Sequence, residues 1–102
     1  MQGIEQECRK ILAGHYGPRL AGVVLYGSEA RGAAGPDSDL DLLVLLSGRF
    51  DHFVELQTIT DLLYPVQLRC DRLISAKPAA VDEYEAGTLQ LYRNARREGV
   101  AV

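Results

Sequence analysis

The hydrophobic and polar positions of the chain follow two periods, which predicts helices and strands in turn. Over residues 3–16 the apolar side chains recur at the spacing of one helix face: Ile4, Cys8, Ile11 and Leu12. This stripe is typical of an amphipathic helix, which Gly14, Gly17 and Pro18 should end. Residues 21–26 (AGVVLY) then form a short apolar run that predicts a buried strand.

A second apolar run, residues 38–46 with the sequence SDLDLLVLL, predicts the next strand. Beyond Asp41 every residue is apolar, so both faces of this strand should be covered, as in a central strand flanked by helices. Between the two strands we expect a short helical turn at residues 29–32, capped by Ser28, and a loop at residues 32–37. This connection leaves the relative direction of the two strands open.

The next segment predicts a helix followed by a third strand. Asp51 is placed to cap the helix, whose apolar stripe consists of Phe53, Leu56, Ile59 and Leu63. Pro65 should end it, because proline lacks the amide that an interior helical position requires. Apolar and polar residues alternate over residues 66–74, which predicts a half-buried strand there.

Two further helices and an extended end are expected after that strand. Pro78 suits the first turn of a helix that Gly87 should break. Thr88 can cap a final helix through Arg97, and residues 99–102 should be extended.

The alternation of strands with helices indicates an α/β (α+β) fold. We expect one domain over residues 1–102, built on a small mixed sheet of three to four strands packed by helices. A length of 102 residues and an apolar share of 47% suit one domain with its own core. The helix before the third strand is long enough to make that strand parallel to the second.

Charge, hydropathy and cysteine spacing argue against several classes of protein. The formal net charge of −3 disfavours a general electrostatic grip on nucleic acid. The longest apolar run, residues 40–46, is far shorter than the roughly 20 residues of a membrane-spanning helix, and no signal peptide is evident, so we expect a cytoplasmic protein. Cys8 and Cys70 have no metal-binding or redox spacing and are expected to be reduced core residues.

Asp39 and Asp41 stand two residues apart at the start of the second strand. On a strand their side chains share one face, with Cα atoms roughly 6.5 Å apart. Carboxylates held so close repel each other, and partial burial favours a cation beside them. Mg²⁺ suits such oxygen ligands and is commonly shared with phosphates. A solvated strand edge would explain a lone pair of aspartates, but the run behind this pair is too apolar for an edge.

The turn before the carboxylate pair has the residues of a phosphate site. Gly27 allows a sharp turn and a close approach of the backbone to a ligand, and Ser28 adds a hydroxyl beside free amides at a helix start. Arg31 can contact a phosphate or pair with Asp37. A capped turn alone would look the same, so the prediction of a metal and phosphate site depends on both motifs together. A phosphate-binding domain without a metal stays an alternative.

These motifs resemble the signature of the DNA-polymerase-β-like nucleotidyltransferase superfamily: glycine-serine, ten intervening residues, then Asp-x-Asp. GSEARG followed by SDLDLLV is especially similar to its minimal nucleotidyltransferase branch, and the similarity extends through LYRNARREGV. The resemblance implies transfer of a nucleoside monophosphate, commonly AMP from ATP, to a hydroxyl. Asp39 and Asp41 would hold Mg²⁺, and Gly27 and Ser28, with Arg31 beside them, would bind the nucleotide phosphates.

The resemblance also implies a protein partner. Minimal nucleotidyltransferases are often encoded beside a HEPN-domain protein, and in the antitoxin members the acceptor is a tyrosine of that toxin. An RNA hydroxyl as acceptor and an oligomeric state stay open. The alternative function is a catalytically impaired module that neutralises a HEPN-type partner by contact.

The third carboxylate implied by the resemblance has two candidates in this sequence. Active members carry an acid between apolar residues on the next strand, where it joins the metal site and helps to deprotonate the acceptor. The segment VQL (residues 66–68) matches this pattern best, but Gln67 is not an acid. Asp71 is on the same face of the predicted strand, about 13 Å further along, so only one of the two can occupy the site. We expect Asp71 to complete a catalytic set with Asp39 and Asp41, unless Gln67 holds the position and leaves the activity weak.

Overall fold

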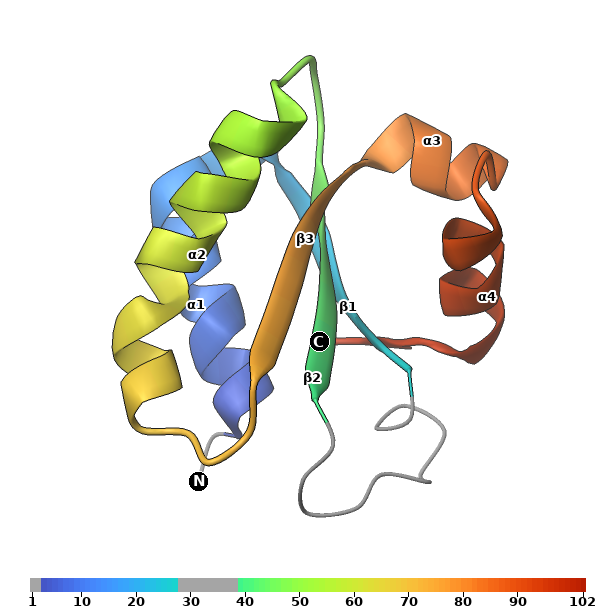
Figure 1. Ribbon diagram of the computed structural model, residues 1–102. Coiled ribbons are helices and arrows are strands. Elements are labelled where there is room, and N and C mark those ends of the chain that lie inside the picture. Colours follow the sequence, from blue (N-terminus) through green and yellow to red (C-terminus); the bar gives the residue numbers. More distant parts are fainter. Residues whose placement is uncertain (1–2, 28–38) are drawn as a thin grey trace.

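The computed structural model describes residues 3–27 and 39–102, which form a four-stranded sheet with helices on both faces (Figure 1). In chain order the elements are α1 (Ile4–Tyr16), the 3₁₀ turn η1 (Gly17–Arg19), β1 (Leu20–Tyr26), β2 (Leu40–Leu46), α2 (His52–Leu68), β3 (Ile74–Ala80), α3 (Val81–Ala86), α4 (Gln90–Glu98) and β4 (Val100–Ala101). The strands lie in the order β3-β2-β1-β4, with β2 parallel to β3 and antiparallel to β1. This arrangement confirms the predicted α/β fold with a mixed sheet.

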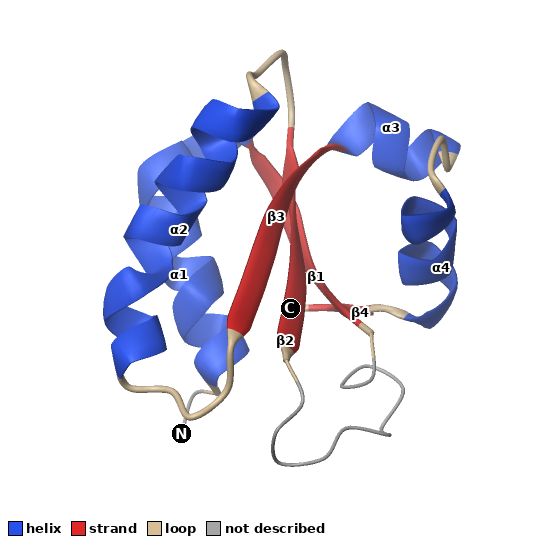
Figure 2. Cartoon of the chain, viewed as in Figure 1, coloured by secondary structure: helices blue, strands red, loops and turns tan. Residues whose placement is uncertain are grey.

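Two helical layers cover opposite faces of the sheet (Figure 2). α1 and α2 pack on one face, over a core that includes Leu12 and Leu42. α3 and α4 cover the other face, where Leu43 and Tyr92 are buried. Successive residues of β2 therefore point into different cores, which explains why the strand is apolar at every position after Asp41.

Helix α2 begins as predicted but runs further than expected. The Asp51 carboxylate caps it by accepting hydrogen bonds from the amides of Phe53 at 3.0 Å and Val54 at 3.1 Å. Phe53 is 79% exposed and does not belong to the buried stripe, so that part of the prediction is wrong. The face that packs against the sheet consists of Ile59, Leu63 and Val66.

The expectation that Pro65 ends α2 is wrong, because the helix continues to Leu68. Proline removes one backbone hydrogen bond from a helix and strains the preceding turn, at a cost of about 3 kcal/mol. Val66 is fully buried at the helical spacing from Leu63, and this burial offsets part of that cost. The alternation over residues 66–74 that predicted a strand is therefore the end of a helix followed by a turn.

The third strand, β3, starts at Ile74 and contains Pro78, which we had expected in a helix. Among the described strands, β3 lies at the edge of the sheet and pairs only with β2. The Leu40 amide donates to the Leu73 carbonyl at 2.8 Å, so the alternating pattern of a parallel pair directs the amides at positions 75, 77 and 79 toward β2. Position 78 faces outward, where a proline without an amide breaks no hydrogen bond of the sheet.

Gln67 joins the end of α2 to the start of β3. Its side-chain amide donates to the Arg72 carbonyl at 2.8 Å, and its side-chain oxygen accepts from the Ile74 amide at 2.7 Å. These two bonds satisfy backbone groups of the turn that connects the helix to the edge strand. Gln67 is therefore a structural residue at the end of α2, and the prediction that it lies on a strand is wrong.

The last elements fix α4 against β1. Gly87 ends α3 as predicted, with a left-handed φ of 68°. Thr88 does not cap α4, which starts two residues later without a side-chain cap. A Cβ at Gly99 would lie 2.7 Å from Cγ1 of Val24, so only glycine lets the chain pass this close to β1. The expected extended end is β4, which pairs with β1.

Both cysteines are free, as expected. Cys8 is fully buried, and this burial raises the pKa of its thiol to about 11. Cys70 is only half-buried, in the turn after α2.

Across the two described stretches of the chain, none of the helices has the length and hydrophobicity needed to cross a bilayer.

The role of Gln67 can be tested by substitution. Gln67→Ala should lower the free energy of unfolding by about 1–3 kcal/mol, because it leaves a part-buried amide and carbonyl without partners. Gln57→Ala is the matched control, because Gln57 bonds only to Asp61 on an exposed helix surface, and it should change stability by less than about 0.5 kcal/mol. Urea denaturation measures both, and equal effects of the two substitutions would contradict the assigned role.

Candidate functional site

Asp39 and Asp41 lie where β2 emerges from between the two helical layers. Asp41 pairs with Tyr26 of β1 on one side and with Ser75 of β3 on the other. These residues share the sheet face that α4 covers further along, because Tyr26 packs at the edge of that core. Asp41 is half-buried, whereas Asp39 just precedes the strand and is exposed.

Gly27 brings the backbone of the preceding turn against the Asp41 carboxylate. Its φ is 77°, a left-handed conformation that glycine adopts without strain. A Cβ built at this position would lie 2.6 Å from Oδ2 of Asp41. Glycine is therefore required here twice, once by the backbone conformation and once by the carboxylate beside it.

The environment of Asp41 disfavours its charged form. Burial raises the pKa of this carboxyl above its ordinary value, the nearby Asp39 raises it further, and Lys77 and Arg72 oppose the shift. A raised pKa in the folded state means that the stability contributed by this group falls as the pH rises above the ordinary aspartate range. At neutral pH the carboxylate pair therefore opposes folding, and a bound cation would relieve this cost.

A small pocket separates the Gly27 turn from α4. It has a volume of about 220 Å³ and is lined by Tyr26, Gly27, Leu91, Asn94, Ala95 and Glu98. The Tyr26 hydroxyl belongs to the same environment, because burial and the Asp41 carboxylate raise its pKa to about 12. The Asp41 carboxylate thus lies next to two residues that line this pocket, Tyr26 and Gly27.

The structure does not place the two predicted candidates for a third acid beside Asp41. Gln67 lies in α2, and Asp71 is exposed in the turn three residues before β3 begins. Both predictions depended on a strand over residues 66–74, which is absent. The residue of β3 beside Asp41 is Ser75. Within residues 3–27 and 39–102 no three histidine, cysteine or acidic side chains are grouped to hold a metal.

Two cations near the carboxylate pair were missed by the sequence analysis. The positive charges of Lys77 in β3 and Arg72 in the preceding turn both lower the pKa of the Asp41 carboxyl. Arg72 also donates to the backbone carbonyl of Asp39 at 3.3 Å. The signal for Lys77 was a single lysine in an apolar segment, which cannot be aligned with Asp41 until the position of β3 is known.

The other predicted binding residues, Ser28 and Arg31, lie outside the described residues, as do the predicted helical turn and loop between β1 and β2. The described part of the site is therefore the Gly27 turn, the carboxylate pair and the start of β3.

The carboxylate pair fits Mg²⁺ by its chemistry. Asp41 is half-buried at the start of β2 and Asp39 is exposed just before it, and both carboxylates can supply hard oxygen ligands. Asp39 is near enough to Asp41 to raise the pKa of its carboxyl. Mg²⁺ typically takes one or two protein carboxylates and completes its shell with water and substrate phosphates. Asp39 and Asp41 would hold the ion, with the remaining ligands supplied from outside the chain.

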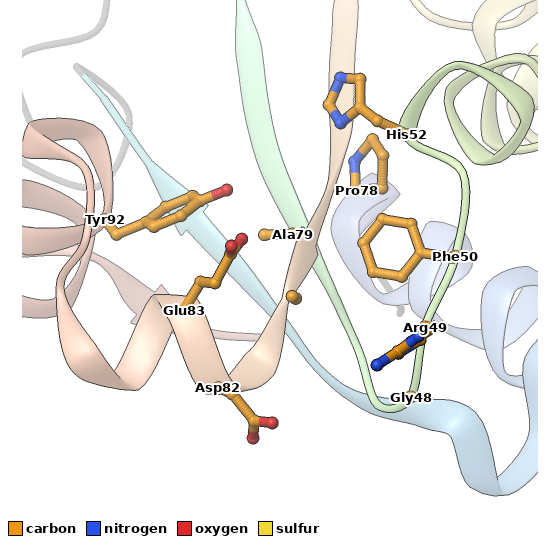
Figure 3. A pocket seen from close by; sticks show the side chains of 10 residues that line it. Gly48, Arg49, Phe50, His52, Pro78, Ala79, Asp82, Glu83 and Tyr92 are labelled. Carbon is orange, nitrogen blue, oxygen red and sulfur yellow. The ribbon is translucent and has the colours of Figure 1, made fainter.

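A larger pocket, of about 570 Å³, lies at the opposite end of the sheet. Figure 3 shows Glu83 and Tyr92 on one wall of this pocket and Arg49 and Phe50 on the other. It borders the last three residues of β3, which pair with the end of β2, about 10–16 Å along the strand from Asp41. Although this pocket is larger than the one beside Gly27, it does not lie at the carboxylate pair.

Comparison with known proteins gives a family for this chain. Residues 5–86 match the model of a family described as nucleotidyltransferase domain. The match spans the Gly27 turn, the carboxylate pair and all of β3. No curated protein matches the chain significantly.

Two solved structures are similar to the chain in fold. A protein from Sulfolobus solfataricus assigned as a nucleotidyltransferase is 18% identical, with a TM-score of 0.66, over 96% of this chain and 75% of that one. A chain of a mutant of the toxin–antitoxin pair MntA–HepT is 19% identical, with a TM-score of 0.63, over 99% of this chain and 72% of that one. At such identities the similarity shows a shared fold.

The contact between Gly27 and Asp41 predicts a difference between two glycine substitutions. Gly27→Ala and Gly48→Ala both place alanine at a left-handed φ, of 77° and 80° respectively, which costs roughly 1–2 kcal/mol. Only Gly27→Ala also forces a Cβ against the Asp41 carboxylate, because nothing lies within 4 Å of a Cβ at Gly48. We expect Gly27→Ala to be the less stable variant in urea and to bind Mn²⁺ more weakly than the wild type, with Mn²⁺ binding of Gly48→Ala unchanged. Equal Mn²⁺ affinities in all three proteins would contradict a site at this contact.

Proposed function

The chain belongs to the nucleotidyltransferase domain family, and from that premise we propose that it transfers a nucleoside monophosphate, AMP from ATP, to a hydroxyl group. The observation that carries the proposal is the close approach of the Gly27 backbone to the Asp41 carboxylate. It brings a turn suited to phosphates beside a carboxylate pair suited to Mg²⁺, as phosphoryl chemistry requires.

In the proposed reaction the acceptor oxygen attacks the α-phosphorus of ATP. A new bond forms between that oxygen and the phosphorus, the bond from the α-phosphorus to the β-phosphate oxygen breaks, and pyrophosphate leaves. The hydroxyl proton passes to solvent. When bound to Asp39 and Asp41, Mg²⁺ would supply positive charge to the phosphates. Gly27, Ser28 and Arg31 would bind and orient the phosphates of the nucleotide.

The acceptor we propose is a hydroxyl of a HEPN-type partner protein, with the chain acting in the cytoplasm as the antitoxin of the pair. One observation supports this assignment: the fold is similar to a chain from the MntA–HepT toxin–antitoxin structure. The acceptor side of the site would then be completed by the partner. An RNA hydroxyl is the other acceptor that this chemistry could serve.

The second candidate function is a catalytically impaired module that neutralises its partner by contact. The observation that favours it is the absence of a carboxylate beside Asp41 on the described β3, where Ser75 stands. Without an acid there, the described residues offer no carboxylate of β3 to take the proton of the acceptor, and any transfer should be slow. Nucleotide and metal binding would persist in either case.

Incubation with ATP labelled at the α-phosphate, Mg²⁺ and the product of the neighbouring gene tests the proposal, with total RNA as a second acceptor. We expect label on the protein partner, lost by at least about a hundredfold with Asp39→Asn or Asp41→Asn. Asp71→Asn is the matched control and should keep the activity, because Asp71 is exposed and is not paired with Asp41 in the sheet.

Label on RNA alone would replace the protein acceptor by an RNA acceptor. Absence of label on both, with intact Mg²⁺-dependent nucleotide binding, would contradict the proposed transfer and favour the contact module.

A further inference from the structure

Lys77 lies beside the carboxylate pair, on the edge strand of the sheet. In the parallel pairing of β2 with β3, Ser75 is beside Asp41 and Lys77 is beside Leu43. Residues two apart on a strand share a face, so Lys77 and Asp41 stand on the same side of the sheet. With strands about 4.8 Å apart and a rise of about 3.3 Å per residue, their Cα atoms are diagonal neighbours roughly 8 Å apart.

The Lys77 ammonium is available to a ligand. Leu43 is buried against the α4 layer, but Lys77 at the sheet edge is exposed. Its charge acts on the Asp41 carboxylate, yet its side chain forms no hydrogen bond or salt bridge with any residue that the structure describes. Arg72 differs in this respect, because its guanidinium is engaged with the Asp39 carbonyl.

The charges of the site explain why a lysine can stand near this position. A site with three carboxylates and two Mg²⁺ has a net charge of about +1 before the nucleotide binds. Two carboxylates with one Mg²⁺ and the Lys77 ammonium give the same net charge of about +1, to which the Arg72 guanidinium beside Asp39 adds further positive charge. A nucleoside triphosphate would therefore meet a similar potential in both arrangements, although the second has fewer ligands for metal.

We infer that Lys77 takes the place of a second metal ion: it binds the phosphates of the nucleotide beside a single Mg²⁺ held by Asp39 and Asp41. This inference rests on the proposed function, because it concerns the same nucleotide and the same carboxylates. Lysine suits the role as a compact positive charge on a flexible stem that binds phosphate. Ser75, next to Asp41, is uncharged and supplies no anionic ligand to offset the charge of a second ion.

Nucleotide affinity and metal stoichiometry test the inference on the full chain. The probes are the non-hydrolysable analogue α,β-methylene-ATP, followed by calorimetry, and Mn²⁺, counted by electron paramagnetic resonance. We expect one Mn²⁺ per chain in the nucleotide complex of the wild type. Lys77→Ala should weaken nucleotide binding by about tenfold or more. Lys10, the only other lysine of the chain, is exposed on α1, and the Lys10→Ala variant should bind the nucleotide as the wild type does.

A second substitution tests whether a carboxylate at Ser75 and a second metal ion can replace Lys77. Ser75→Asp in the Lys77→Ala background places a carboxylate beside Asp41 and removes the ammonium, so the complex should hold two Mn²⁺ and recover part of the lost affinity. Two Mn²⁺ in the wild-type complex, or unchanged affinity in Lys77→Ala, would overturn the inference. Asp41→Asn distinguishes failure of the Lys77 inference from failure of the proposed function. If Asp41→Asn loses Mn²⁺-dependent nucleotide binding and Lys77→Ala has no effect, only the role of Lys77 is refuted. If Asp41→Asn retains that binding, the proposed function is refuted as well.

Discussion

Burial of β2 on both faces is the constraint on which the rest of the structure depends. Its last five residues are all buried and point alternately into two cores, so the strand is stable only when helices cover both sides of the sheet. α1 and α2 provide one layer, and α3 and α4 provide the other. Where β2 emerges from these layers, its first residues carry the carboxylates. Asp39 and Asp41 repel each other there and one of them is partly desolvated, which opposes folding at neutral pH. Natural proteins tolerate such local costs mainly at functional sites.

The sequence predicts the elements whose pattern is strong and local. α1, β1 and β2 have periodic or continuous apolar runs, and the structure has them within two residues of the predicted bounds. The predicted position of the third strand was wrong because Pro65 was expected to end a helix and Pro78 to begin one. Pro65 lies in the last turn of α2, where Val66 still reaches the core, and Pro78 lies on the outer side of an edge strand, where its missing amide has no cost. The contact of Gly27 with Asp41 depends on pairing between strands separated by a long connection, so no local pattern could show it. Ser75 and Lys77 became neighbours of the site only when the register of β3 was known.

The corrected register changes the interpretation of the site more than that of the fold. The question posed by the sequence was whether Gln67 or Asp71 is the third acid, and the structure places neither beside Asp41. Gln67 stabilises the turn before β3, and Asp71 lies in that turn. A serine beside Asp41 with a lysine one position along the same face is a different chemical arrangement from three carboxylates. We propose that this arrangement retains the positive charge needed to bind a nucleotide. The described β3 has no carboxylate beside Asp41 that could act as a base for the transfer. The larger pocket between Glu83 and Arg49 begins about 10 Å along the sheet from Asp41, and its lining does not include the carboxylate pair.

The central claim is that the Gly27 turn and the Asp39–Asp41 pair form one metal and nucleotide site. Titration of the ¹⁵N-labelled protein with Mn²⁺ in the presence of α,β-methylene-ATP tests it most directly, because the paramagnetic ion broadens amide signals according to their distance from it. The account predicts that broadening begins at the amides of Tyr26, Gly27 and Leu40, extends to Ser75, and leaves those of Gly48 and Phe50 sharp. Broadening centred on residues 48–50 and on the α3 acids Asp82 and Glu83 would contradict it.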